Sequence, residues 1–88
     1  MAMIFDRIAV LGVGLIGSSI AHAARESGVT RVVQLYDANP EVRQRARELG
    51  LGEVFDDPVK AVEKAELVVL CVPVGAMASA IEAAKRGL

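Results

Sequence analysis

The stretch Ile8-Ala9-Val10-Leu11-Gly12-Val13-Gly14-Leu15-Ile16-Gly17 joins a short apolar run to a glycine-rich turn with the spacing G-x-G-x-x-G. The apolar run has the length of a buried strand and stops at the first glycine. After the turn, apolar residues recur at the spacing of one helix face, at Ile16, Ile20, Ala23 and Ala24. The stretch therefore predicts a strand, a tight turn and a helix in direct succession.

The three glycines of this turn have different physical roles in such an arrangement. Gly12 lets the chain leave the strand sharply, and Gly14 lets a phosphate approach the backbone because it has no side chain. Gly17 lets the following helix pack closely on the sheet. The first helical turn has unpaired N–H groups, and we expect Leu15 and Ile16 to supply these groups to a phosphate.

An acidic residue stands where a dinucleotide-binding turn requires one. Asp37 follows the apolar run Val32–Tyr36 and comes twenty residues after Gly17. A carboxylate at this place accepts the ribose hydroxyls of adenosine and repels a 2′-phosphate, so it favours NAD over NADP. Three alternatives stay open: a tight strand–helix turn without a ligand, an aspartate at the end of a strand that only caps the next turn, and an FAD site with the same pattern.

The rest of the chain continues the alternation of strands and helices. Asn39-Pro40 and Asp57-Pro58 are helix start signals, in which an N-cap side chain precedes a proline. We expect further strands at 32–36, 53–55 and 67–72 and helices at 40–50, 58–64 and 75–86. This order predicts an α/β, Rossmann-like three-layer fold with a parallel sheet of about four strands in the order 3-2-1-4, an incomplete doubly wound fold.

Length and composition limit the classes of protein that the chain can belong to. Its 88 residues are enough for one domain, which we expect to be a dinucleotide-binding half-Rossmann domain over 1–88. The net charge of −1, without a basic stripe, argues against a nucleic-acid partner. The longest apolar run, Leu67–Val74, is too short to cross a membrane, and the first residues lack the features of a signal peptide. We therefore expect a cytoplasmic protein without a membrane partner.

Several other residues have side chains that invite a functional interpretation. Val72, Pro73 and Val74 follow the fourth predicted strand beside the glycine turn, and we expect them to line the cofactor cleft. His22 is interpreted as a helix-surface residue and Cys71, the single cysteine, as a core residue; we expect no metal site. The charges on the second helix are interpreted as one solvated face, formed by Glu41, Arg43, Arg45, Arg47 and Glu48.

Two stretches, Ile8–Ser19 and Ala65–Gly75, resemble the prephenate and arogenate dehydrogenases of tyrosine biosynthesis. The combination of Gly-Leu-Ile-Gly-Ser with Val-Pro-Val is more specific than the glycine pattern, although related β-hydroxyacid dehydrogenases come close. The resemblance implies an NAD-dependent oxidoreductase that removes a hydride and releases carbon dioxide. It also implies that the catalytic histidine and arginines lie beyond the fourth strand, so we expect no catalytic residue within this chain; His22 does not match that histidine.

The fourth predicted strand is apolar on both faces and has no predicted neighbour on one edge. Exposed apolar edges pair with other chains. We therefore expect either a piece of a longer protein or self-association through this edge, for example as a homodimer. The alternatives to the NAD-binding part of a prephenate or arogenate dehydrogenase are a non-catalytic half-Rossmann module, natural or engineered, and a fragment of another β-hydroxyacid-type dehydrogenase.

Overall fold

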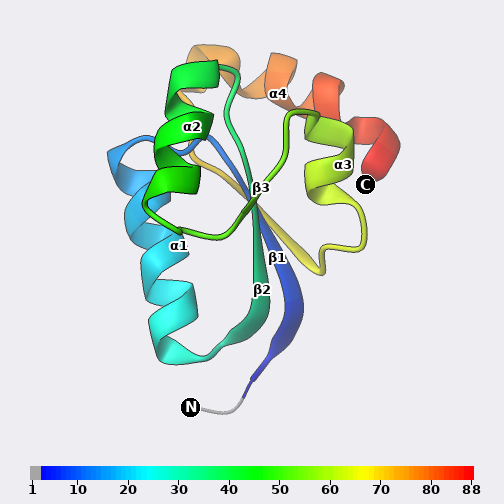
Figure 1. The fold of residues 1–88 in the computed structure, drawn as a ribbon. Coiled ribbons are helices and arrows are strands. Elements are labelled where there is room, and N and C mark those ends of the chain that lie inside the picture. Colours follow the sequence, from blue (N-terminus) through cyan, green and yellow to red (C-terminus); the bar gives the residue numbers. More distant parts are fainter. Residues whose placement is uncertain (1–2) are drawn as a thin grey trace.

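The computed structural model describes residues 3–88, and its elements alternate along the chain (Figure 1). The strands are β1 (Phe5–Leu11), β2 (Thr30–Tyr36), β3 (Glu53–Val54) and β4 (Leu67–Leu70). The helices are α1 (Leu15–Ser27), α2 (Pro40–Glu48), α3 (Pro58–Val62) and α4 (Met77–Ala84), and α4 is flanked by the short 3₁₀ helices η1 (Val74–Ala76) and η2 (Lys85–Gly87).

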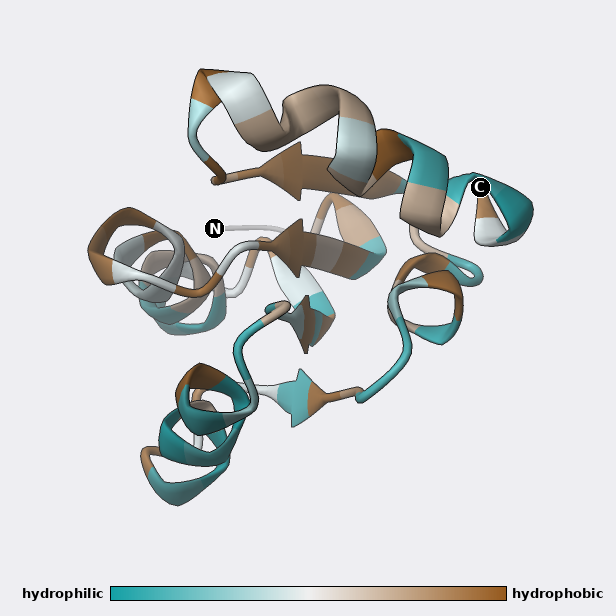
Figure 2. Cartoon of the chain, turned by 90° about the horizontal axis from the view of Figure 1, so that it is seen from above, coloured by the Kyte–Doolittle hydropathy of each residue, from teal (hydrophilic) through white to brown (hydrophobic). Residues whose placement is uncertain are grey.

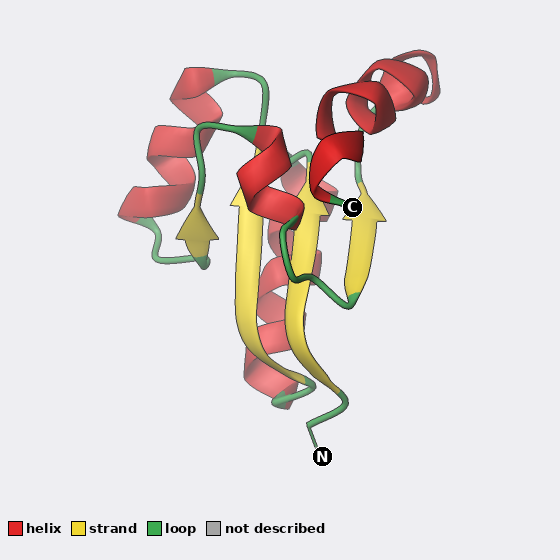
Figure 3. Ribbon diagram, turned by 90° about the vertical axis from the view of Figure 1, so that its right-hand side faces the viewer, coloured by secondary structure: helices red, strands yellow, loops and turns green. Residues whose placement is uncertain are grey.

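The strands form one parallel sheet in the order β3-β2-β1-β4, which confirms the predicted order (Figure 3). The register places the carboxyl ends of three strands at one level. Leu11 at the end of β1 is the partner of Tyr36 on β2 and of Leu70 on β4. The loops that follow β1, β2 and β4 therefore begin side by side at one edge of the sheet.

Both faces of the sheet are covered by helices, as Figure 2 shows from above. Alternate residues of β1 enter two separate cores: Ile8 and Val10 pack on the α1 and α2 side, and Ala9 and Leu11 pack on the α3 and α4 side. The first core also contains Val13 of the glycine turn and residues of α1, α2 and β2, namely Ala21, Ala24, Val33, Leu35 and Ala46. The apolar runs in the sequence thus reflect strands that are buried on two faces.

The last part of the chain differs in detail from the prediction. β4 ends at Leu70 instead of residue 72, and the predicted last helix is divided into η1, α4 and η2. The first difference follows from the pairing, because β1 ends at Leu11, the partner of Leu70, and Pro73 has no N–H group with which the strand could continue beyond it. Leu67 at the start of β4 is 39% exposed, so the fourth strand is less buried than its composition suggests.

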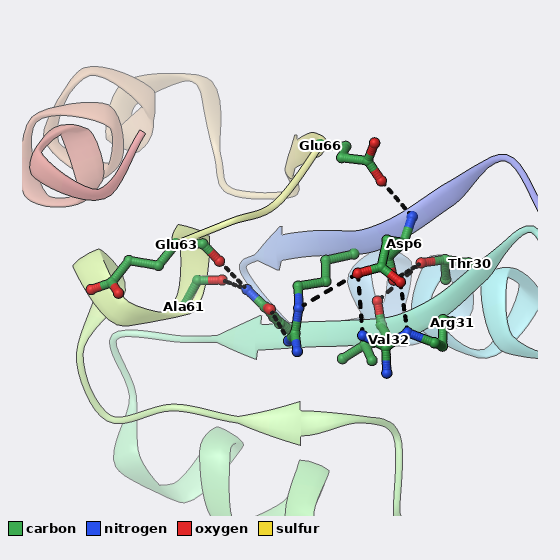
Figure 4. Close-up of polar contacts among 9 residues, drawn as sticks. Asp6, Thr30, Arg31, Val32, Ala61, Glu63 and Glu66 are labelled. Carbon is green, nitrogen blue, oxygen red and sulfur yellow. Dashed lines mark hydrogen bonds and ion pairs between the residues drawn. The ribbon is translucent and has the colours of Figure 1, made fainter.

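A buried polar side chain connects the sheet to α3, and the sequence did not reveal it. Gln34 on β2 is 1% exposed, and its Oε1 accepts from Arg7 Nη1 (2.7 Å). Its Nε2 donates to the carbonyl oxygens of Ala61 (2.6 Å) and Glu63 (3.2 Å), the two acceptors labelled at α3 in Figure 4. A buried amide is tolerated only when its donors and acceptors are satisfied, and here they are. Gln34 therefore fixes the end of α3 against the sheet.

Candidate functional site

The glycine turn lies between the ends of β2 and β4. Gly12 has φ +96°, and a Cβ on it would lie 2.5 Å from the carbonyl oxygen of Cys71. Its N–H donates to the carbonyl of Tyr36 at 2.8 Å. A residue with a side chain would therefore be strained at this position and would push the β4 loop away. This contact fits the sharp turn that the spacing predicts.

The two other glycines differ in their surroundings. A Cβ on Gly17, which is buried in α1, would overlap the carbonyl oxygen of Gly12, so the helix can pack this closely on the turn only with glycine. A Cβ on Gly14 would meet no atom within 4 Å. Gly14 therefore leaves open space beside the backbone, which is the condition for a phosphate to approach it.

The N-terminus of α1 has donors without acceptors. Gly14 is the N-cap, no side chain caps the helix, and its first turn holds no acidic residue. The first hydrogen bond runs from the Ser18 N–H to the Gly14 carbonyl (2.9 Å), and within 3–88 the N–H groups of Leu15, Ile16 and Gly17 have no acceptor. These donors and the positive end of the helix dipole together form an anion-binding arrangement.

Asp37 is bound to the glycine turn through its side chain. Its Oδ2 accepts from the Val13 N–H (2.8 Å) and its Oδ1 from the Asn39 N–H (2.9 Å). The cap of α2 is Asn39, whose Oδ1 accepts from the Glu41 N–H (2.9 Å). Each carboxylate oxygen of Asp37 retains a lone pair, because a carboxylate accepts about four hydrogen bonds. The carboxylate is thus held in place and can still accept hydroxyl groups.

The loops after the three strands enclose a cavity of about 510 Å³ against α4. Its lining is mainly apolar, with the Asp37 carboxylate among the few polar groups. It is formed by Gly12, Gly14, Tyr36, Asp37, Ala38, Pro58, Cys71, Val72, Pro73, Ala76, Ser79, Ala80 and Ala83. A mainly apolar cavity with few polar groups is typical of sites for small molecules and cofactors.

The structure brings together part of the predicted set. Gly12, Gly14, Asp37, Val72 and Pro73 line this cavity. The other predicted site residues lie outside this lining. Gly17 lies beneath the turn, and Leu15 and Ile16, whose side chains are 89% and 71% exposed, offer only their N–H groups. Val74 is 84% exposed and belongs to η1 instead of the cavity lining.

The wall formed by α4 was missing from the sequence prediction. Ala76, the last residue of η1, and Ser79, Ala80 and Ala83 of α4 recur at intervals of three and four residues, and all line the cavity. Residues at this spacing share one face of a helix. The sequence contains this wall as a row of small residues after Pro73, but such a row is equally typical of an ordinary helix rich in alanine.

The reactive residues singled out from the sequence show no catalytic arrangement. Cys71 lines the cavity, and burial raises the pKa of its thiol, which favours the protonated form. His22 is exposed on α1 outside the cavity lining.

No group of three or more His, Cys, Asp or Glu side chains in residues 3–88 is placed to hold a metal ion. Within the same residues, no helix has the length and apolarity needed to cross a membrane.

The interpretation of the α2 charges as one solvated face is wrong for Arg43. The Arg43 side chain is 15% exposed and its Nε pairs with Asp56 Oδ1 at 3.0 Å. Arg47 Nη2 contacts the same oxygen at 2.7 Å. The hydrogen bonds from Arg47 and then from Arg43 lower the pKa of Asp56 below its usual range. Arg43 therefore belongs to a polar cluster beside the Asp37 turn.

Comparison with known proteins gives matches over most of the chain. The family model of the prephenate dehydrogenase nucleotide-binding domain matches residues 20–88. A cyclohexadienyl dehydrogenase of Zymomonas mobilis is 52% identical over 75 residues, which cover 84% of this chain and 26% of that protein. The family match begins after Gly17, so it does not depend on the glycine pattern.

Solved structures share the fold. A prephenate dehydrogenase from A. aeolicus, solved with hydroxyphenyl propionate and NAD⁺, has a TM-score of 0.83 at 28% identity over the whole chain and 31% of its own length. A UDP-N-acetylglucosamine 3-dehydrogenase from Acidithiobacillus ferrooxidans has a TM-score of 0.71 at 23% identity, which supports the fold alone. The chain spans about a quarter to a third of the length of these relatives. The match of the family model to residues 20–88 means that the chain belongs to the family of the prephenate dehydrogenase nucleotide-binding domain.

Proposed function

We propose that residues 1–88 form a dinucleotide-binding domain that holds the ADP part of NAD. The observation that carries the proposal is the convergence of two groups at one edge of the sheet. The free N–H groups of α1 and the Asp37 carboxylate lie on either side of Gly14, where the chain leaves open space. The donors suit the pyrophosphate and the carboxylate suits the ribose hydroxyls.

Each part of the cavity and of the glycine turn beside it suits one part of this ligand. Leu15, Ile16 and Gly17 offer N–H groups to the phosphates, and Asp37 accepts the ribose hydroxyls. The apolar lining from Val72 and Pro73, together with the α4 wall, suits the adenine ring. These residues fit an uncharged ribose 2′-hydroxyl better than a 2′-phosphate, because Asp37 would repel the phosphate.

The activity of the whole protein is proposed from the family. We infer that the chain is the cofactor-binding part of an NAD-dependent oxidoreductase of tyrosine biosynthesis that acts on prephenate or arogenate in the cytoplasm. When bound, NAD accepts a hydride from the substrate. In support, the A. aeolicus relative was solved with NAD⁺, and the Z. mobilis relative is a cyclohexadienyl dehydrogenase. The near-neutral charge of −1 suits a small-molecule ligand better than nucleic acid.

Calorimetric titration of the 88-residue chain with NAD and with NADP tests the proposed function. We expect NAD to bind with a Kd in the micromolar to millimolar range and NADP to bind at least about tenfold more weakly, since one unfavourable charge contact costs about 1.4 kcal/mol or more. Nicotinamide mononucleotide, which lacks the adenosine part, is the control and should not bind measurably. Absence of NAD binding at millimolar concentration, or a preference for NADP, would contradict the proposal.

We also propose that a second copy of the chain pairs with the open edge of β4. Within residues 3–88, β4 pairs only with β1, and beside it lies an apolar groove of about 470 Å³. The groove is lined by Phe5, Ile8, Ile20, Ala23, Ala24, Ser27, Val29, Leu67 and Val69. An open strand edge next to an apolar groove favours antiparallel pairing of two identical strands about a twofold axis.

Light scattering after size-exclusion chromatography tests this pairing. We expect the chain to be a dimer at high concentration and the Leu67→Lys variant to be a monomer, because a lysine at a strand edge opposes edge-to-edge pairing. Leu67 is partly exposed, so the substitution leaves the core intact. Leu49→Lys, the same substitution at an exposed residue at the end of α2 and outside the groove, is a control that should leave the dimer unchanged. A monomeric parent chain at millimolar concentration would rule out the proposal.

A further inference from the structure

Arg43 lies directly behind the turn that carries Asp37. Its Nη1 donates to the carbonyl oxygens of Asp37 (2.8 Å) and Ala38 (3.4 Å). The guanidinium carbon lies 5.6 Å from the centroid of the Tyr36 ring, within the range of a cation–π contact. Asp37, Ala38 and Tyr36 all line the cavity, whereas Arg43 does not. The arginine therefore supports the cavity wall from its outer side.

Asp56 fixes the other side of Arg43. Its Oδ1 accepts from Arg43 Nε (3.0 Å) and from Arg47 Nη2 (2.7 Å). Asp56 belongs to the loop between β3 and α3, and Pro58, the first residue of α3, is another residue of the cavity lining. The arginine thus joins the loop after β2 to the loop after β3. The loop after β2 and the first residue of α3 both contribute to the cavity lining.

Two of the three guanidinium nitrogens of Arg43, Nε and Nη1, donate to acceptors of the protein itself. An arginine close to the end of the second strand often binds the 2′-phosphate of NADP in dinucleotide-binding folds. Here Nε is bound to a carboxylate and Nη1 to two backbone carbonyls. From its place in the sequence, Arg43 would be interpreted as a phosphate ligand. In the structure its side chain instead stabilises the conformation of the turn that carries Asp37.

We propose that Arg43, anchored by Asp56, is a positioning residue that holds the Asp37 carboxylate in the orientation required to accept the ribose hydroxyls. This inference rests on the proposed function. Asp37 receives bonds at its side chain from Val13 and Asn39 and at its carbonyl from Arg43. Removing the bond at the carbonyl leaves the turn with fewer constraints, and small displacements of a binding group reduce its contribution to affinity.

Amide hydrogen exchange of the unliganded chain tests the positioning directly. We expect Arg43→Met, which keeps an unbranched side chain over Tyr36 but has no N–H donors, to exchange the Val13 and Asn39 amides at least about threefold faster. The amides of Val10 and Leu35 in the core should keep their rates. Arg45→Met is the matched control, because Arg45 lies on the same helix and makes no ion pair within residues 3–88. Unchanged exchange at Val13 and Asn39 would overturn the proposal.

A double-mutant cycle of NAD affinity tests the consequence for binding. We expect Arg43→Met to weaken NAD binding about threefold to tenfold in the parent chain and less than about twofold in an Asp37→Asn background, because the two residues act through one contact. An equal loss in both backgrounds, or an equal loss in Arg45→Met, would overturn the proposal. Asp56→Ala, which leaves Arg43 in place but removes its anchor, should weaken binding in the same direction; no change in that variant would contradict the role of Asp56.

The two experiments separate this proposal from the proposed function. If the parent chain does not bind NAD, the proposed function fails, and the exchange of the Val13 and Asn39 amides still decides whether Arg43 holds the turn. If the parent chain binds NAD and Arg43→Met binds it equally well, the proposed function stands and the positioning role fails. Faster exchange without loss of affinity would also overturn it, because the turn would then loosen without affecting the site.

Discussion

Gly17→Ala is expected to prevent stable folding, whereas Gly14→Ala is expected to fold normally and to lose nucleotide binding. A Cβ on Gly17 would overlap the backbone oxygen of Gly12, and neither the turn nor the helix can move without breaking the contact with β4. Forcing backbone apart in a core costs more than about 3 kcal/mol, a large part of the roughly 5–15 kcal/mol that stabilises a domain. On Gly14 the same methyl group meets no protein atom and instead occupies the space that a phosphate needs.

Thermal unfolding followed by circular dichroism, together with NAD titration, separates the two effects. Gly75→Ala is the control, because a Cβ there also meets nothing within 4 Å and the residue is not part of the cavity lining. It should change neither stability nor affinity. Gly14→Ala should unfold near the temperature of the parent chain and bind NAD at least about tenfold more weakly. A Gly17→Ala chain as stable as the parent, or a Gly14→Ala chain with full affinity, would contradict these roles.

Asp37→Ala is expected to lower the affinity for NAD by about tenfold to a hundredfold, which corresponds to the roughly 1.5–3 kcal/mol of hydrogen bonds to a charged group. The loss for NADP should be smaller, because the same substitution removes the repulsion of the 2′-phosphate. The preference for NAD over NADP should therefore narrow. Paired calorimetric titrations of both cofactors measure this change directly.

The control for Asp37→Ala is Asn39→Ala in the same turn. It removes the side-chain cap of α2 and should cost about 1 kcal/mol of stability while leaving the cofactor preference unchanged. Asp37 also accepts bonds from Val13 and Asn39, so its removal will lower stability as well. The ratio of the two affinities is the decisive quantity, since general destabilisation changes both cofactors alike. An unchanged ratio would mean that Asp37 does not contact the ribose.

The order of the strands and the glycine turn could be predicted because they depend on local patterns. A strand, a G-x-G-x-x-G turn and a helix follow one another in the sequence, and the proline signals at Asn39 and Asp57 mark the starts of α2 and α3. In both helices the N-cap side chain accepts a hydrogen bond, as those signals imply. The predicted ends of the elements were less accurate, because the end of a strand or helix depends on the segments packed beside it, as in the loop at Pro73.

The supporting polar contacts could not be predicted in the same way. Arg43 looks like any charged residue of an exposed helix until its partner Asp56, thirteen residues away, is brought beside it. Gln34 lies in an apolar strand, and only the end of α3 explains why an amide is buried there. Contacts of this kind depend on tertiary packing, whereas the periodicity of a sequence reports only which face of an element is apolar.

The cavity has walls from the two ends of the chain, Gly12 after the first strand and Ala83 near the end of the last α-helix. A nucleotide bound there would act as a non-covalent cross-link between the loop after β1 and α4, which lie far apart in the sequence. By mass action, a ligand at a hundred times its Kd adds about 2.7 kcal/mol to the free energy of unfolding. The cofactor would thereby be a structural component of this small domain, and its cellular concentration would help to decide how long the folded chain survives proteolysis.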